Sequence, residues 1–259
     1  MRKIAIANQK GGVGKTTTTI NLAAAIARTN KKVLVIDMDP QGNASFGLGV
    51  DCDNIPTVRE LLVNEVKLEE AIHPTYLPNL SIIPSDITLS SAERALSSSP
   101  GADFKLKTRL KDLRGFDYVM IDCAPTLGTI ALNAFTASDE LILPIALSPF
   151  ALKGIEGFFE TLDFVNEELG SHIGHEVRVL GALITFFDVR TNVSKRMFEE
   201  LKENISDLLF KTTIPQNVKL KESQEFRKSI FDYDAKSPAA IAYEKLAEEM
   251  LKRGKSWRS

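Results

Sequence analysis

The segment Gly11-Gly-Val-Gly-Lys-Thr-Thr17 lies between an apolar run that ends at Asn8 and a run of helical period that begins at Lys15. Its glycines can adopt backbone conformations closed to other residues, which lets successive N–H groups turn toward one centre. The first turn of the following helix adds its positive end to that centre, which suits phosphate. The order of strand, glycine-rich turn and helix therefore predicts an α/β sheet that binds a nucleoside triphosphate.

The side chains of this loop have separate expected roles. Lys15 supplies a positive charge to the β- and γ-phosphates, and the hydroxyl of Thr16 can ligate Mg²⁺. We therefore expect ATP and Mg²⁺ as cofactors. The loop residues expected to contact the nucleotide are Lys10, Gly11, Gly12, Val13, Gly14, Lys15, Thr16 and Thr17.

Short apolar runs alternate with longer segments of helical period through the rest of the chain. This alternation predicts a single domain over residues 1–259: an α/β fold with one mostly parallel, twisted sheet and helices on both faces. The predicted strands are Lys3–Asn8, Lys32–Asp37, Leu80–Ile83, Tyr118–Asp122, Glu140–Pro144 and Val177–Thr185, with a short seventh at Lys211–Ile214. The predicted helices are Lys15–Arg28, Ala131–Ala137, Leu152–Leu169 and Asn192–Leu209, with a short one inside Ser85–Ala102.

Composition limits the classes of function that remain open. The 259 residues are 44% apolar and carry a formal net charge of −2, so the chain is not globally basic. Any nucleic-acid contact must then come from a local cluster of cations. Cys52 and Cys123 have no metal or disulfide spacing, and neither a signal peptide nor an apolar run of ~20 residues is present. We expect a cytoplasmic protein.

Two carboxylate-bearing segments complete the predicted site. Val33–Asn43 is a strand that delivers Asp37 and Asp39 to the carboxyl edge of the sheet, where open α/β sheets bind ligands. A carboxylate at Asp39 can orient or deprotonate the attacking water. Val119–Pro125 ends a second strand at Asp122, which would hold Mg²⁺ through water. The expected metal-binding residues are Thr16, Asp39 and Asp122.

The loop also departs from the common pattern, which requires glycine at Gln9. Read from Lys10 to Thr17, it resembles the deviant Walker motif of the ParA and MinD class of ATPases. By that resemblance Lys10 reaches the nucleotide of a partner subunit, and the catalytic residues are Lys10, Lys15 and Asp39. Thr126–Gly128 matches a second switch, although Ala124 replaces the first of two prolines that often precede it. Thr213–Leu220 resembles the segment that packs on the base, which implies Pro215 and Asn217.

The resemblance to the ParA/Soj partition ATPases covers nearly the whole chain and implies more than ATP hydrolysis. It implies a homodimer that forms on ATP, a ParB-like stimulating protein and association with the nucleoid. Arg190 and Lys219 match positions that bind double-stranded DNA without sequence preference, and Lys221 lies beside them. The run Glu222–Ser229 departs from the Glu-Ala-Pro-Ser sequence common in partition ATPases.

Three alternatives remain open at this stage. A MinD-like regulator would bind membrane through the amphipathic segment Ala239–Leu251 and Trp257, but its acidic residues and the possibility of docking on the sheet favour no membrane contact. A ParA-like ATPase could instead position a protein cargo on the nucleoid. An iron–sulfur dimer would need suitably placed cysteines, and only Cys123 lies near the nucleotide motifs.

Overall fold

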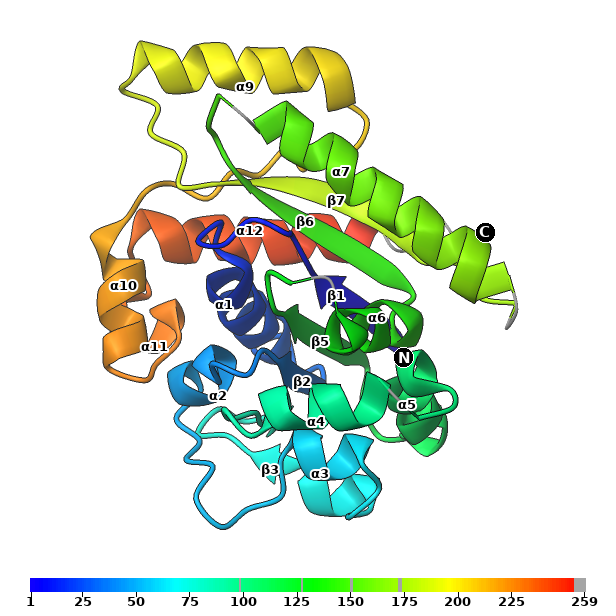
Figure 1. Cartoon of the computed structure of the whole chain (residues 1–259). Helices are drawn as coiled ribbons and strands as arrows, with labels where there is room; N and C mark the ends of the chain where they lie inside the picture. Colours follow the sequence, from blue (N-terminus) through cyan, green and yellow to red (C-terminus); the bar gives the residue numbers. More distant parts are fainter. Residues whose placement is uncertain (98, 127, 150, 172–173, 254–259) are drawn as a thin grey trace.

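A computed structural model describes residues 1–97, 99–126, 128–149, 151–171 and 174–253. In this part of the chain, seven strands form one sheet in the order β3-β4-β2-β5-β1-β6-β7 (Figure 1). Neighbouring strands are parallel except for the antiparallel pair β3 and β4. The strands are β1 (Arg2–Ile6), β2 (Val33–Met38), β3 (His73–Pro74), β4 (Leu80–Ile83), β5 (Tyr118–Cys123), β6 (Glu140–Ala146) and β7 (Arg178–Thr185). The predicted α/β class is confirmed.

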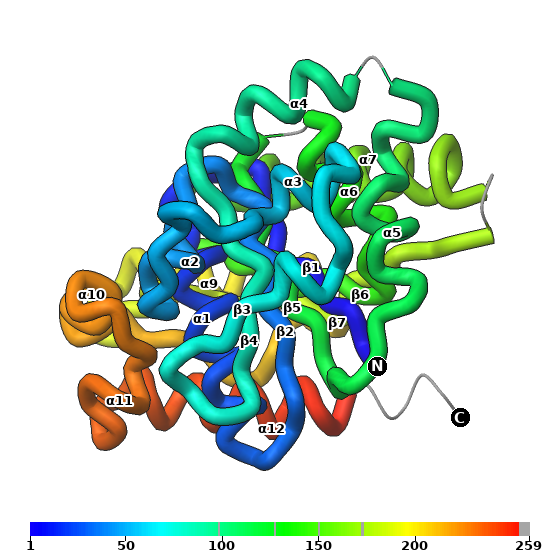
Figure 2. The backbone as a smooth tube through the Cα atoms, turned by 90° about the horizontal axis from the view of Figure 1, so that it is seen from below, coloured from blue at the N-terminus to red at the C-terminus, as the bar shows by residue number. Residues whose placement is uncertain are grey.

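Helices cover both faces of this sheet. The α-helices are α1 (Lys15–Ala27), α2 (Asn43–Gly47), α3 (Val58–Leu62), α4 (Leu89–Ser97), α5 (Lys105–Arg109), α6 (Thr129–Ala137), α7 (Ala151–Phe164), α9 (Asn192–Ile205), α10 (Val218–Glu225), α11 (Ile230–Asp234) and α12 (Pro238–Arg253). Short 3₁₀ turns lie at η1 (Leu68–Ala71), η2 (Ala102–Phe104) and η3 (Leu110–Asp112), and a π-helical turn, η4 (Val165–Gly170), follows α7. Viewed from below, α12 lies on one side of the sheet and α3 to α6 on the other (Figure 2).

The strands separate two apolar cores because successive side chains point to opposite faces. In β1, Ile4 and Ile6 pack in the core that holds α1 and α12, whereas Ala5 packs in the core that holds α6 and α7. The apolar stripe of α12, which includes Leu246 and Met250, is buried against this first core. The segment that the membrane alternative invoked is therefore a helix docked on the sheet, and Trp257 lies outside the described residues. No described helix has the length and apolar character needed to cross a bilayer.

The predicted seventh strand at Lys211–Ile214 is wrong. Isolated parallel bridges flank the segment, from Leu209 to Ala182 in β7 and from Pro215 to Phe187 just beyond β7, but no ladder forms between them. The reason is that the carboxylate of Glu249 on α12 accepts hydrogen bonds from the backbone N–H groups of Lys211 and Thr212, at 2.8 and 3.0 Å. The seventh strand is instead the two-residue β3, which is too short to produce a periodic pattern.

Two predicted helices end earlier than expected. The first extends to Phe164 as an α-helix and then widens into η4, where the side-chain amide of Asn166 bonds both the N–H and the carbonyl of Val177. The second, α9, ends at Ile205 rather than Leu209. The strand Leu80–Ile83 has the predicted bounds, and the short helix within Ser85–Ala102 is confirmed as α4.

A capping box at the start of α3 gives the fold a pH-dependent contact. Thr57 and Glu60 bond each other's backbone and side-chain groups. Burial alone would raise the pKa of Glu60, but hydrogen bonds from Thr57 and Arg59 outweigh it and lower the pKa from 4.5 to about 2. Since the folded pKa is the lower one, this contact stabilises the fold above pH 4.5, and the contribution is lost as the pH falls toward 2.

We therefore expect Glu60→Gln to reduce the free energy of unfolding by about 1 kcal/mol at pH 7. The difference from the wild-type chain should shrink at pH 3, because the wild-type carboxylate is then losing its advantage. Urea unfolding at the two pH values measures this directly. An equal difference at both would contradict the assigned contact.

Candidate nucleotide site

The loop between β1 and α1 has the shape of a phosphate cradle. Gly12 and Gly14 have φ angles of +71° and +88°, in the left-handed region that favours glycine. A Cβ atom at Gly11 or Gly12 would meet no atom within 4 Å, so the loop leaves open space along one side. A Cβ at Gly14 would lie 3.1 Å from the ring of Phe186, which excludes larger residues there. The loop therefore suits a phosphate group that approaches the backbone closely.

The two lysines of the loop point to different places. Lys15 is buried, and its Nζ donates to the carbonyl of Lys10 at 3.1 Å across the loop. Burial lowers the pKa of Lys15, and the nearby Asp122 opposes this effect. Lys10 is exposed, and its Nζ donates to Oγ of Ser148 at 3.0 Å, beyond the end of β6. Lys15 is thus placed for a phosphate in its own loop, whereas Lys10 is exposed and bonds Ser148 outside the loop.

Asp122 at the end of β5 meets the start of α1. Its Oδ2 accepts a hydrogen bond from Thr16 Oγ1 at 2.7 Å, and its Oδ1 accepts one from Thr19 Oγ1 at 2.8 Å. Burial raises the pKa of Asp122 to about 8, and the neighbouring carboxylate of Asp37 adds to the shift. A carboxylate held in this environment favours a nearby cation. The predicted Thr16 and Asp122 pair is therefore brought together in a set of oxygens that fits Mg²⁺.

The two aspartates at the end of β2, Asp37 within it and Asp39 just after it, have different surroundings. Asp37 is fully buried, accepts hydrogen bonds from the N–H and Oγ of Ser45 and from the N–H of Asp39, and lies opposite Asp122 in the sheet. Burial raises its pKa to about 6. Asp39 is also buried, but its Oδ1 accepts a backbone N–H bond from Gln41 at 2.9 Å. Asp37 therefore shapes the turn, and Asp39 is the carboxylate that this turn presents.

The predicted base-binding segment lies beside the loop in space. Asn217 caps α10, and its Oδ1 accepts the N–H of Lys219 at 2.9 Å. Pro215 forms a parallel bridge with Phe187, just beyond β7. Farther along α10, Nε2 of Gln224 donates to Oγ1 of Thr17 at 2.9 Å, across 207 residues of sequence. The helix that begins in this segment is thus in direct contact with the phosphate loop through its far end.

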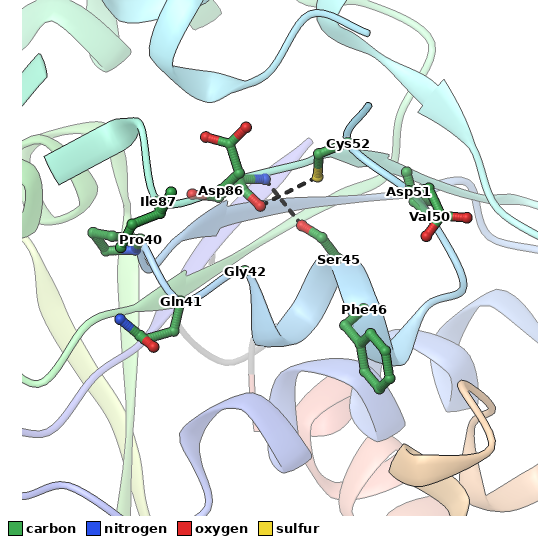
Figure 3. Close-up of a pocket in the computed structure, with 11 residues that line it drawn as sticks. Pro40, Gln41, Gly42, Ser45, Phe46, Val50, Asp51, Cys52, Asp86 and Ile87 are labelled. Carbon is green, nitrogen blue, oxygen red and sulfur yellow. Dashed lines mark hydrogen bonds between the residues drawn. The ribbon is translucent and has the colours of Figure 1, made fainter. Parts of the chain in front are cut away.

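A pocket of about 290 Å³ lies on the far side of the turn that follows Asp39 (Figure 3). The thiol of Cys52 donates to the carbonyl of Ser85 at 3.3 Å, and the N–H of Ser85 donates to Ser45 Oγ at 2.9 Å. The lining residues are Pro40, Gln41, Gly42, Ser45, Phe46, Val50, Asp51, Cys52, Ser85, Asp86 and Ile87. Because none of them belongs to the loop Lys10–Thr17, this pocket is separate from the phosphate cradle.

The three predicted DNA contacts lie on two segments near the same end of the sheet (Figure 1). Arg190, with 84% of its side chain exposed, pairs with Asp188 at 2.9 Å after β7. Hydrogen bonds from Arg190 lower the pKa of Asp188 to about 2. Lys219 on α10 pairs with Glu222 at 2.8 Å, and Lys221 is exposed. Two of the three cations therefore have a carboxylate neighbour that a phosphate would have to replace.

Comparison with known proteins places this site in a family. Residues 1–175 match the AAA domain family, AAA_31. The chain is 40% identical over 254 residues to the chromosome partitioning protein ParA of Myxococcus xanthus, covering 97% of this chain and 88% of that protein. It is also 40% identical over 253 residues to the sporulation initiation inhibitor protein Soj of Bacillus subtilis, covering 97% and 98%. The chain belongs to the ParA/Soj family of P-loop ATPases.

A solved structure also resembles the chain over nearly its whole length. Cobyrinic acid a,c-diamide synthase from Mycobacterium smegmatis, with a bound ATP analogue and magnesium, superposes with a TM-score of 0.84. The two are 34% identical, and the alignment covers 99% of this chain and 96% of that one. The recognition of the family from its motifs is therefore confirmed.

Three side chains that bond the predicted site residues were not found from the sequence. Thr19 shares Asp122 with Thr16, Ser148 binds Lys10, and Gln224 binds Thr17. Thr19 lies three residues after Thr16, so its position on the same side of α1 was a usable signal. No local pattern marked the other two, and Leu127 of the predicted second switch lies outside the described residues.

Proposed function

We propose that the chain is a Mg²⁺-dependent ATP hydrolase that forms a homodimer on binding ATP, binds double-stranded DNA without sequence preference, and segregates or positions DNA on the nucleoid. A ParB-like protein would stimulate its turnover, and residues 1–259 would act as a single cytoplasmic domain. The observation that carries this proposal is the divergence of the two loop lysines. An exposed cation that bonds Ser148 rather than a group of its own loop is available to a triphosphate bound by a second copy.

The side chains support hydrolysis of ATP to ADP and phosphate. Lys15 lies where it can contact the β- and γ-phosphates, and Thr16 with Asp122 would hold Mg²⁺, which neutralises phosphate charge when bound. Asp39 is presented at the carboxyl edge of the sheet, where it can orient a water molecule for attack. Pro215 and Asn217 would contact the base; they directly precede α10, whose far end bonds Thr17 of the loop.

Dimerisation on ATP binding distinguishes the proposed ATPase from an enzyme that transfers phosphate to a substrate. We expect the wild-type chain to be monomeric without nucleotide and dimeric with Mg²⁺ and a slowly hydrolysed ATP analogue, as measured by light scattering after gel filtration. Binding of two DNA-contacting surfaces at once strengthens affinity without new contacts. A chain that stays monomeric with saturating nucleotide would exclude this mechanism.

Arg190→Glu tests the DNA surface. Neutralised phosphates release counterions, so removing and reversing one contact per subunit should weaken the ATP-dependent DNA affinity at least about 10-fold at 0.1 M salt. Dimerisation should be unchanged, because the side chain of Arg190 is exposed and bonds only its neighbour Asp188 among the described contacts. Fluorescence anisotropy with random-sequence duplex DNA measures the effect.

Arg178→Glu is a matched control for this experiment. Arg178 begins β7 at the opposite edge of the sheet and pairs with Glu176, two residues earlier, as Arg190 pairs with Asp188. The net charge change is the same, so a general electrostatic effect would weaken both variants equally. Equal losses would remove Arg190 from the DNA surface.

Membrane association is less well supported than DNA binding. The apolar face of α12 is used in packing on α1 and the sheet, so it is not free to enter a lipid interface. Co-sedimentation with anionic liposomes in the presence of ATP would distinguish the two functions, since DNA-dependent positioning requires no pelleting.

A further inference from the structure

The end of α10 and the segment after it contact two elements near the predicted nucleotide site. Gln224 donates from Nε2 to Thr17 Oγ1 at 2.9 Å, at the last residue of the phosphate loop. Three residues later, the guanidinium of Arg227 lies 5.1 Å from the ring centroid of Phe46 and bonds Asp51 at 2.6 Å. Phe46 lies on α2, which directly follows the turn that presents Asp39. The end of α10 and the residues just after it therefore contact the phosphate loop and α2.

The hydrogen bond at Thr17 leaves a donor available. A hydroxyl group has one proton to donate and two lone pairs to accept with. Because Gln224 occupies a lone pair of Thr17, the proton of that hydroxyl can still be given to a phosphate oxygen. Donation to an anion strengthens the hydroxyl as an acceptor, since hydrogen bonds in a chain polarise one another. The contact between Gln224 and Thr17 should therefore tighten when nucleotide binds.

The segment that follows α10 has an uncommon backbone conformation at Arg227. Its φ is +54°, which is unusual for a residue with a side chain. It occurs where the guanidinium of Arg227 reaches Phe46 and Asp51.

Few residues of α10 are buried, which makes these contacts important for its orientation. Of its eight residues, Leu220 and Ser223 are buried, whereas Val218 at the start is 63% exposed. The same short helix carries Lys219 and Lys221, two of the proposed DNA contacts. A change at Thr17 can therefore move the helix without disrupting a large core.

We propose that Gln224 is a positioning residue that couples nucleotide binding at Thr17 to the orientation of α10 and its DNA-facing cations. This inference rests on the proposed DNA-binding function for its readout, but the hydrogen bond also affects nucleotide affinity by itself. With nucleotide bound, Gln224 holds the end of α10 against the loop. Without nucleotide, the contact is weaker and α10 is freer to turn.

The test replaces Gln224 with leucine, which has a similar size and no hydrogen-bonding group. Gln224→Leu should weaken binding of a slowly hydrolysed ATP analogue about 5-fold, as expected for loss of one hydrogen bond. It should also lower the ratio of DNA affinities with and without nucleotide at least about 10-fold, because the effect is doubled in a dimer. Glu225→Leu is the matched control: this neighbour is exposed, and its variant should stay within about 2-fold on both measurements.

A role in folding alone gives a different result. It would lower the melting temperature of the nucleotide-free protein and leave the nucleotide-induced rise in melting temperature unchanged, and that outcome would overturn the proposal. The variants Thr17→Val, Gln224→Leu and their combination form a thermodynamic cycle for nucleotide affinity. We expect the double variant to bind no more weakly than Thr17→Val. Additive losses would show that the two side chains act independently.

Two further experimental outcomes, an unstable variant and a lack of DNA binding, have their own interpretation. If Gln224→Leu is unstable, Gln224→Asn replaces it, because its amide is one methylene too short to reach Thr17 and it should show the same nucleotide and DNA effects. If the wild-type chain shows no nucleotide-dependent DNA binding, the proposed function fails. The cycle at Thr17 then decides the role of Gln224 at the loop, and the coupling to DNA is rejected.

Discussion

Replacing Lys15 with alanine should abolish ATP binding. The ammonium group lies in a buried position within 3.1 Å of the carbonyl of Lys10, across the mouth of the loop, so it is preplaced for phosphate rather than drawn in from solvent. Charge-assisted hydrogen bonds contribute about 1.5–3 kcal/mol each, and contact with two phosphates makes the expected loss of affinity at least about 100-fold. Isothermal titration with ATP and Mg²⁺ measures the loss.

A lysine at the other end of α1 serves as the control. Lys31 is exposed just after this helix, so Lys31→Ala should bind ATP with wild-type affinity. The melting temperature of nucleotide-free Lys15→Ala should not fall, because the substitution removes a partly desolvated charge whose pKa burial already lowers. Retained affinity in Lys15→Ala would show that the loop is not the nucleotide site.

Asp39→Ala should separate binding from hydrolysis. The variant should bind ATP, dimerise and remain on DNA, because Asp39 is not part of the hydroxyl and carboxylate set at Thr16 and Asp122. Its turnover should fall at least about 100-fold, the usual contribution of a positioned acid or base. Steady-state release of phosphate and gel filtration of the ATP complex measure the two properties.

Asp53→Ala is a suitable control, since Asp53 is exposed in the loop after α2. Normal turnover by Asp39→Ala would refute its assignment to the attacking water. Loss of both binding and hydrolysis would instead indicate that Asp39 is needed as a metal ligand. The experiment therefore distinguishes between the two roles that the sequence assigned to this residue.

The sequence predicted which segments meet at the site, but the spacing of its residues did not predict the role of each side chain. Asp37 and Asp39 are both carboxylates at one strand end, and their spacing gives no reason to choose between them. In the structure, Asp37 accepts three hydrogen bonds from its own turn and faces Asp122 across the sheet. Its carboxylate is therefore committed to holding the turn, and Asp39 is the carboxylate that we propose acts on the nucleotide.

The incorrect prediction of a strand at Lys211–Ile214 also results from side-chain hydrogen bonds that the local sequence does not reveal. The segment has the apolar and β-branched character of a strand, and the backbone donors needed for pairing are present. Those donors are satisfied by Glu249, which lies on a helix 37 residues or more farther along the chain. Local composition cannot reveal a competing acceptor of this kind.

By itself, the sequence determined the fold class, the phosphate loop and the carboxylate-bearing strands, because each depends on patterns within about 15 residues. Glycine spacing, strand-length apolar runs and helical periodicity act through local backbone preference and through burial of one face. Only the tertiary structure decided that Lys10 turns toward Ser148 and that Gln224 reaches Thr17 across 207 residues. Such contacts depend on the order of strands in the sheet and on the packing of helices against it, which no local pattern contains.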